Sequence, residues 1–417
     1  MTETSLPRTA HDPATPVELP RGFRAHVTNI GIKDDTDDFV VLASTEPCTS
    51  AAVFTRSRFA GPSVVVSRRH AAGNDLRAVV VVSKNANVAT GPEGLANAEE
   101  LGRGVAGAVG CPEEQVLITS TGVIGRQYPM DRVRAALDAL GERATGALDE
   151  HPAFRDTDAW RAATGMMTTD THPKVAVATL PSTLADGTTS TATIVGLAKG
   201  VGMIEPDMAT MLTFVLTDAA VDAAQLDTTF RSAVARTFNS LSVDTDTSTS
   251  DTAAVLANGL AGTVDADAFA AALESVCTDL TRQLARDGEG ATKLLLVRVD
   301  GARDDDQARR VAKAVVNSPL VKTAVHGADP NWGRVAMAVG KCSDDTDIDE
   351  DHVVIRFGDA EVYPTPVDED GLARLERYLA GDEVLITVDL GIAEASWTVY
   401  GCDLSDGYVR INADYTT

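Results

Sequence analysis

Residues 198–219, AKGVGMIEPDMATMLTFVLTDA, combine a lysine and a threonine with a turn and an apolar strand. Lys199 precedes a glycine, a proline-containing loop follows, and Thr210 stands just before an apolar run. On composition alone this is an ordinary loop that enters a strand, because Gly and Pro occur in most loops. A dinucleotide-binding fingerprint is excluded, since Glu205 occupies the position where the third glycine would be needed.

Thr210 could serve as a nucleophile if the chain were cut directly before it. A threonine hydroxyl is a weak nucleophile and needs an adjacent base. A newly exposed α-amino group, with a pKa of about 8, supplies that base on the same residue. In such a cut the Thr210 hydroxyl attacks the Ala209 carbonyl, the acyl group shifts from nitrogen to oxygen, and water opens the ester. Cleavage would therefore create the catalyst, and the small side chain of Ala209 leaves room for the attack.

Seven blocks of the chain, in order, resemble blocks of the ornithine acetyltransferase family. Besides residues 198–219 they are STGVIGR (120–126), MTTDTHPK (167–174), DTDTSTSDT (244–252), DGEGATK (287–293), SPLVKTAVHGADPNWGR (318–334) and YVRINADYTT (408–417). The runs GRQYPM, DTDTSTSDT and GKCSDDTDID are especially similar to the antibiotic-cluster branch, which is found with clavulanic acid biosynthesis genes.

This resemblance implies a layered α+β fold, the N-terminal-nucleophile-like fold of ornithine acetyltransferases and β-aminopeptidases. The precursor would split between Ala209 and Thr210 into an α chain, residues 23–209 after a loose extension of residues 1–22, and a β chain, residues 210–417. Thr210 would take acetyl from N-acetylornithine, release ornithine and pass the acetyl group to glutamate, with ping-pong kinetics. The family also implies an oligomer of αβ heterodimers, and we expect no cofactor or metal.

The resemblance also assigns the site residues. The oxyanion of each tetrahedral intermediate would be held by the Thr121 hydroxyl and the Gly122 backbone N–H. Substrate contacts fall on Thr168, Lys199, Thr210, Glu289, Asn412 and Thr417. Lys199 suits a substrate carboxylate and Glu289 suits an ornithine amine. Taken singly, these residues are ordinary: a turn after a strand, a surface lysine, a charge at a helix end and a chain terminus.

Two other functions stay open. A self-processing aminopeptidase or amidase of the same fold would resolve the acyl-enzyme with water instead of glutamate, and a catalytically silent homologue would act as a binding protein. Acetyl-CoA as a further acyl donor, and an arginine or antibiotic pathway, are equally open.

Residues 244–252 are not a calcium-binding loop, because the sixth position lacks glycine and Val255 stands at the twelfth. We expect an ordered, hydrogen-bonded loop near the site, of open role.

The elements around these residues are predicted from periodicity. β-branched runs between residues 39 and 82 (DFVVLAS, AAVFT, PSVVVS, AVVVVS) predict strands, as do QVLITS, VAVATL, TATIVGLAKG, TMLTFVLTDA, KLLLVRVDGA, HVVIRFG, EVLITVDL and ASWTVYGCDL. Helices are predicted at residues 92–109, 129–140, 223–238, 268–286 and 368–380, and a connecting loop at 141–160. Helices segregate from strand runs, which favours layered α+β over a doubly wound sheet.

Composition limits the partners. The net charge of -25, from 36 Lys and Arg against 61 Asp and Glu, argues against nucleic acid. Five widely spaced cysteines without a CxxC pair predict reduced thiols and a cytoplasmic protein. Residues 1–22 lack the apolar core of a secretion signal, and the longest apolar run, residues 78–82, is too short to cross a bilayer.

Overall fold

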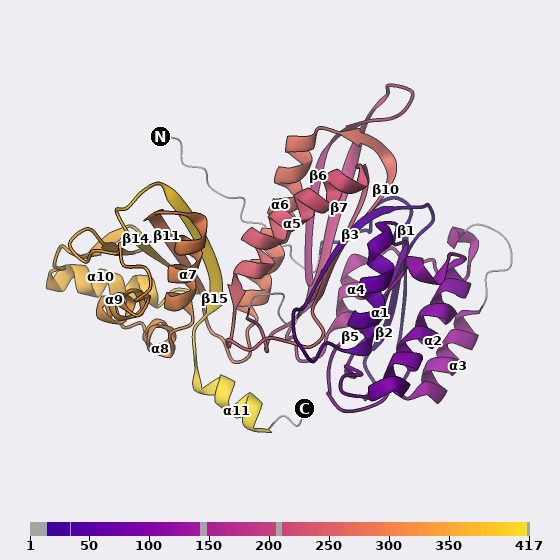
Figure 1. Ribbon diagram of the computed structural model, residues 1–417, viewed down its shortest axis with the longest axis horizontal. Helices are drawn as coiled ribbons and strands as arrows, with labels where there is room; N and C mark the ends of the chain where they lie inside the picture. The colour runs from indigo at the N-terminus through magenta and orange to yellow at the C-terminus, as the bar shows by residue number, and fades with distance from the viewer. Residues whose placement is uncertain (1–14, 34, 142–147, 206–210, 415–417) are drawn as a thin grey trace.

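The computed structural model describes residues 15–33, 35–141, 148–205 and 211–414. Its described strands form three sheets (Figure 1). The first sheet has the order β1-β2-β4-β5, from β1 (Phe23–Thr28), β2 (Phe39–Ser44), β4 (Ala78–Val82) and β5 (Val116–Ser120). The second contains β3 (Thr49–Phe54), β10 (Thr252–Val264), β6 (Lys174–Thr183), β7 (Thr189–Lys199) and β8 (Leu212–Ala220), and β10 also pairs with β8.

The third sheet has the order β13-β12-β14-β11-β15-β9. Its strands are β9 (Leu241–Ser242), β11 (Leu294–Ala302), β12 (Val354–Phe357), β13 (Ala360–Tyr363), β14 (Glu383–Asp389) and β15 (Ala395–Cys402). The helices are α1 (Pro62–His70), α2 (Gly91–Val109), α3 (Met130–Leu140), α4 (Ala159–Met166), α5 (Ala223–Arg236), α6 (Ala266–Arg286), α7 (Asp305–Val316), α8 (Pro319–His326), α9 (Trp332–Gly340), α10 (Glu369–Leu379) and α11 (Asp406–Asp414).

The first two sheets pack face to face and are covered by helices on their outer sides. One core joins inward side chains of the two sheets, such as Val79 and Phe214, with Trp160 of α4. A second core lies between the first sheet and helices α1–α3, and a third lies between the second sheet and helices α5 and α6. These layers give the order helix, sheet, sheet, helix, which is the predicted layered α+β class.

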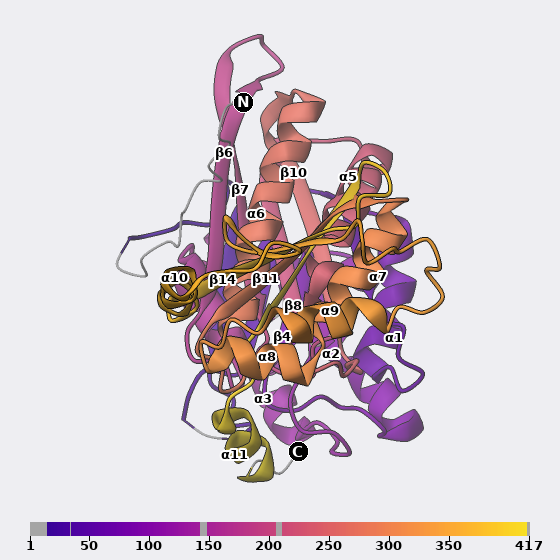
Figure 2. The same cartoon turned by 90° about the vertical axis from the view of Figure 1, so that its left-hand side faces the viewer.

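The third sheet forms a separate layer with helices α7 to α10, which share its core (Figure 1). Strands β6 and β7 make a long hairpin that projects beyond the body of the molecule, and α11 lies at the opposite end (Figure 2). Helix α6 joins the second and third sheets, because it contacts β6 and β7 of the second sheet and β11 and β15 of the third.

One predicted strand is wrong. PSVVVS, residues 62–67, forms the first turns of helix α1, with Pro62 in its first turn and basic residues in its last. Ser67 Oγ accepts a hydrogen bond from Ile118 N at 2.8 Å and donates one to Ile118 O at 2.7 Å, which docks the helix on β5. A proline at a helix start and this packing outweigh the strand preference of three valines.

Two other expectations need correction. Residues 15–22, part of the extension predicted to be loose, pack against the body: Val17 and Leu19 are buried, and Trp160 Nε1 donates to Thr15 O at 2.9 Å. The loop predicted at residues 141–160 already includes the start of α4 at Ala159.

All five cysteines are free, and three of them are buried. No helix among the described residues has the length and apolarity that a bilayer crossing requires.

Candidate active site

The candidate active site lies where β7 ends and β8 begins. The two strands pair antiparallel with Lys199 opposite Leu212, so both ends of the connecting loop lie at one edge of the second sheet. Ala209 and Thr210, the predicted cleavage pair, lie outside the described residues. Met211, the neighbour of Thr210 in the chain, is buried directly before β8. The described residues therefore fix where the chain enters and leaves this segment.

Lys199 is buried and joined to another predicted contact residue. Its side chain is 3% exposed, and its Nζ donates a hydrogen bond to Thr168 Oγ1 at 2.8 Å. Asp170 Oδ2 lies 3.7 Å from the same nitrogen. Burial lowers the pKa of Lys199, and the Asp170 carboxylate opposes that shift. Lys199 is therefore no solvated surface lysine, and the structure places it beside Thr168.

Asp170 organises this end of β7. Its Oδ1 accepts hydrogen bonds from Lys174 Nζ at 2.8 Å and from Gly200 N at 2.6 Å, and its Oδ2 accepts one from Thr168 N at 3.1 Å. Burial alone would raise the pKa of Asp170, but the Lys199 and Lys174 ammonium groups and these hydrogen bonds hold it well below its usual range. The carboxylate is therefore charged although it is buried.

Lys174 extends the network across the fold. It is fully buried, and its Nζ also donates to Asp287 Oδ2 at 2.6 Å. We call Asp170, Lys174, Lys199 and Asp287 the buried charge cluster. Its two cations and two anions balance, and each ion has an oppositely charged neighbour, which is the condition under which buried charges are tolerated.

Glu289 and Asn412, both predicted contacts, lie next to the loop after β7. Asn412 Nδ2, on α11, donates to Glu289 Oε2 at 3.0 Å. Glu289 N donates to Val201 O at 2.8 Å. A Cβ at Gly202 would lie 2.5 Å from Glu289 Oε2, so any larger residue there would displace the Glu289 carboxylate. Thr417, the remaining predicted contact, lies outside the described residues.

Thr121 and Gly122 form the turn that follows β5. Thr121 is 2% exposed, and within the described part of the chain its Oγ1 has no hydrogen-bond partner. Gly122 has φ 128°, and a Cβ there would lie 2.2 Å from the backbone carbon of Lys84. Glycine is therefore required by both its conformation and its close contact. A buried hydroxyl with unused donor capacity fits the predicted oxyanion role.

Comparison with known proteins decides the family. A model of the ArgJ family matches residues 24–417. The chain belongs to this family. It is 56% identical to glutamate N-acetyltransferase Oat2 of Streptomyces clavuligerus over 407 residues, which are 96% of this chain and 98% of that protein. It is 52% identical to arginine biosynthesis bifunctional protein ArgJ of Rhodococcoides fascians over 95% of this chain and 94% of that protein.

Among solved structures, the chain is similar to arginine biosynthesis bifunctional protein ArgJ from Bacillus halodurans. The identity is 41% over 48% of this chain and 98% of that chain, with a TM-score of 0.46. The ArgJ family is the ornithine acetyltransferase family predicted from the sequence, so the family, its fold class and the acetyltransferase class are confirmed. The narrower resemblance agrees with the Streptomyces clavuligerus match. A role in antibiotic synthesis and a cytoplasmic location stay predictions.

The aspartate loop, residues 244–252, is linked through the start of α1 to the turn that holds Thr121. Gly61 N donates to Thr249 O at 2.9 Å, and a few residues on, Ser63 Oγ lies 3.1 Å from Ser120 Oγ, directly before the Thr121 turn. The expectation of an ordered, hydrogen-bonded loop is therefore confirmed. Sequence reasoning gave this loop no role.

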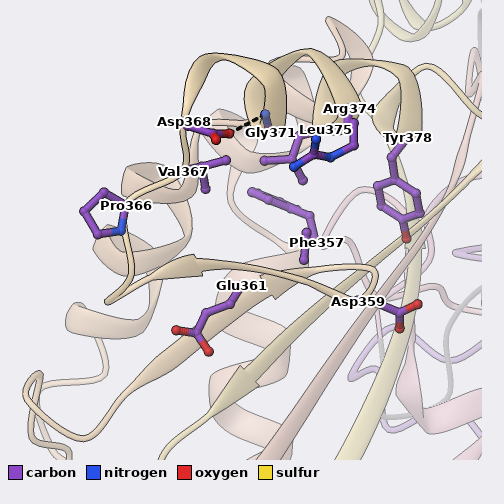
Figure 3. A pocket seen from close by; sticks show the side chains of 11 residues that line it. Phe357, Asp359, Glu361, Pro366, Val367, Asp368, Gly371, Arg374, Leu375 and Tyr378 are labelled. Carbon is purple, nitrogen blue, oxygen red and sulfur yellow. Dashed lines mark hydrogen bonds between the residues drawn. The ribbon is translucent and has the colours of Figure 1, made fainter.

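A cavity of about 490 Å³ lies elsewhere, between α10 and the β12–β13 hairpin (Figure 3). Phe357 and Leu375 contribute apolar surface, while Arg374, Asp359 and Glu361 contribute charge. No site residue predicted from the ArgJ-family resemblance lines it. Within the described ranges there is no cluster of three or more His, Cys, Asp or Glu side chains able to hold a metal ion.

Sequence reasoning missed three members of the buried charge cluster. Asp170 and Lys174 belong to the block MTTDTHPK, and Asp287 begins the block DGEGATK, yet only Thr168 and Glu289 were singled out there. The available signal was a lysine at the first position of an apolar strand, KVAVATL, where a charge must be paired if it is buried.

Proposed function

We propose that the protein is a self-processing acetyltransferase that moves acetyl from N-acetylornithine to glutamate through an acetyl-Thr210 intermediate. The observation that supports it most is the convergence of Thr168, Lys199, Glu289 and Asn412 around the loop that leads to residue 210. These residues come from four separate places in the chain, and the resemblance had assigned each of them to substrate.

Self-processing would generate the nucleophile. The Thr210 hydroxyl adds to the Ala209 carbonyl, the C–N bond breaks, and the acyl group passes to the Thr210 oxygen as the α-amine forms. Water then cleaves the ester, giving an α chain that ends at Ala209 and a β chain that begins at Thr210. The free α-amine then accepts the hydroxyl proton in each acetyl transfer.

The two proposed chains, residues 23–209 and 210–417, would remain together because they share the second sheet. β7 of the α chain pairs antiparallel with β8 of the β chain over Ile194–Lys199 opposite Leu212–Thr217. β3 of the α chain pairs with β10 of the β chain from Thr49 to Phe54. A cut in the loop between β7 and β8 breaks none of these hydrogen bonds.

The site offers complementary charges to an amino-acid substrate. We assign the substrate carboxylate to Lys199, whose ammonium is held by Thr168 and Asp170. Glu289 faces Asn412 and the Thr169 hydroxyl, which lies 3.4 Å from its Oε1, and it suits the side-chain amine of ornithine. Ornithine release and glutamate entry would use the same carboxylate site, which is compatible with ping-pong transfer.

Thr121 and Gly122 would stabilise each tetrahedral intermediate. The acetyl carbonyl oxygen becomes an oxyanion when Thr210 or glutamate attacks, and two donors fixed in advance need no reorganisation at that moment. Loss of one such donor raises the barrier by about 3 to 4 kcal/mol. Within the described residues, Thr121 Oγ1 has no hydrogen-bond partner. The hydroxyl is therefore available to donate to the oxyanion.

The test is to incubate the purified protein with N-acetylornithine, with and without glutamate, and to quantify N-acetylglutamate and free acetate. We expect N-acetylglutamate that requires glutamate, little acetate, and no product from Thr210→Ala. Acetate released at the same rate without glutamate would instead identify an amidase, and no product from the wild type would identify a binding protein. A parallel reaction with acetyl-CoA tests that donor, and sedimentation tests the proposed oligomer of αβ heterodimers.

A further inference from the structure

The aspartate loop holds the backbone on the N-terminal side of residues 206–210. Met203 N donates to Asp244 Oδ2 at 2.6 Å, and Ile204 N donates to Asp244 Oδ1 at 2.8 Å. Val243 N donates in turn to Ile204 O at 2.8 Å, and Ile204 forms a β-bridge with Thr247. One carboxylate thus uses both oxygens on two successive amides, and its loop pairs with the same short stretch.

The other end of the loop holds the backbone on the C-terminal side. Met211 N donates to Asp251 Oδ1 at 3.1 Å, and Thr252 N donates to Met211 O at 3.2 Å. The Met211 nitrogen is covalently bonded to the carbonyl carbon of Thr210, so Asp251 acts one peptide bond from that residue. Parallel pairing of Thr252 with Leu212 then continues into β10 and β8.

The loop is firmly mounted on the α-chain side of the fold. Thr55 Oγ1 donates to Ser248 O at 2.6 Å, and Thr55 N donates to Asp251 O at 3.0 Å. Gly61 N donates to Thr249 O at 2.9 Å. These contacts connect the loop to β3 and to the start of α1, so it cannot shift without disturbing both.

Stability alone does not explain the two carboxyl groups. Asp251 is 0% exposed, and its Oδ2 has no hydrogen-bond partner within the described residues. Burial raises the pKa of Asp251 well above its usual range and also raises the pKa of Asp244. Buried carboxyl groups without a cationic partner in contact are costly. An unsatisfied buried polar atom such as Asp251 Oδ2 is uncommon in folded proteins, and a catalytic role is one of the reasons for which such atoms are found.

We propose that Asp244 and Asp251 are positioning residues for self-cleavage, which fix the backbone on both sides of the bond between Ala209 and Thr210. The inference rests on the proposed function. Intramolecular attack needs the reacting atoms held close and aligned, and hydrogen bonds to Ile204 and Met211 fix the backbone from which the reacting residues extend. The geometry thereby gives a role to residues 244–252.

The experiment compares the rate of precursor cleavage among variants that differ in acceptor atoms. Asp244→Asn replaces one of two acceptor oxygens with a donor, so we expect cleavage to slow about tenfold or more. Asp251→Asn keeps the oxygen that Met211 N needs and should stay within about threefold of wild type, whereas Asp251→Ala should again slow about tenfold. Asp246→Asn, an exposed change in the same loop, is the matched control and should cleave like wild type.

Cleavage is followed by denaturing electrophoresis and mass spectrometry after synthesis of the precursor, and circular dichroism checks folding. Wild-type rates in both Asp244→Asn and Asp251→Ala would overturn the inference. Where Asp251→Ala does not fold, the near-isosteric Asp244→Asn decides alone. A wild-type chain that stays uncut would contradict the proposed function itself, whereas a cut wild type with equally fast variants contradicts only the positioning role.

Discussion

The buried charge cluster and the cavity beside α10 differ in almost every physical respect. The cluster holds two cations and two anions that are nearly inaccessible and are paired at distances down to 2.6 Å. The cavity, about 490 Å³ in volume, has charged groups such as Arg374 on exposed parts of α10 and on a hairpin (Figure 3). Only the cluster adjoins residues that the family resemblance assigns to substrate.

The difference shows that the volume of a cavity and the chemistry of its side chains are separate criteria for recognising a functional site. A hollow between a helix and a hairpin forms wherever two elements diverge, but burying four charges requires exact complementarity that the fold must maintain. Strongly perturbed and specifically paired groups are therefore better indicators of a functional site than empty space. Substitutions in the two regions should therefore differ sharply in their effects on stability and on acetyl transfer.

The largest effect is expected for Lys174→Met. Removal of this ammonium leaves Asp170 and Asp287 buried without their shared partner, so the free energy of unfolding should fall by about 3 to 5 kcal/mol. Denaturant titration followed by circular dichroism measures it. Lys341→Met, an exposed control, should change stability by no more than about 0.5 kcal/mol. Equal losses of unfolding free energy in the two variants would show that the buried charge cluster does not stabilise the fold.

Lys199→Met should lower kcat/KM for acetyl transfer even in protein that is cleaved and folded. Loss of a buried charge that meets the substrate carboxylate should lower kcat/KM for N-acetylornithine about a hundredfold. Steady-state kinetics on cleaved, folded protein provides the measurement. An unchanged kcat/KM would remove Lys199 from substrate binding.

Acid should weaken the fold through Asp170. Its pKa is held below the value of about 3.9 found in unfolded chains, so the charged form stabilises the folded state above that pH. As the pH falls below about 4 the unfolded chain takes up the proton first, and this stabilisation is lost at up to about 1.4 kcal/mol per pH unit. Unfolding free energies between pH 6 and pH 3 should therefore fall more steeply for wild type than for Asp170→Asn. Parallel curves would contradict the pairing.

The smallest effect is expected at the cavity. Arg374→Ala should change kcat/KM less than about twofold, and it should change the unfolding free energy by no more than about 0.5 kcal/mol, because the side chain is exposed. The same assays apply. A tenfold loss of kcat/KM would give the cavity a role in acetyl transfer and would contradict the difference between the two regions.

Sequence patterns predicted the elements best where periodicity and length agreed. The helix predicted at residues 268–286 is α6, Ala266–Arg286, and the strand ASWTVYGCDL contains β15, Ala395–Cys402. The strand predicted from the valine run of α1 was wrong. Its helical state depends on docking against β5, and a local sequence pattern does not contain that contact. Helices α7 to α9 fall in a stretch for which no elements were predicted.

The candidate site shows the same limit. Lys199 and Glu289 could be named through the resemblance, but the pairing of Lys174 with Asp287 spans 113 residues and exists only once β6 and the end of α6 meet. The roles of Asp244 and Asp251 likewise depend on which backbone amides the fold brings to them. Residue types and blocks identify the candidates, while long-range pairing determines how they act.

The proposed function requires that Thr210 becomes both a chain terminus and the acetyl carrier. Mass spectrometry of the purified protein after a brief incubation with N-acetylornithine tests it most directly, beside Thr210→Ala. We predict two fragments, residues 210–417 and a fragment that ends at Ala209, with the mass of one acetyl group added only on Thr210, and an intact unmodified chain from the variant. An uncut, active wild-type chain, or acetylation at another residue, would contradict the account.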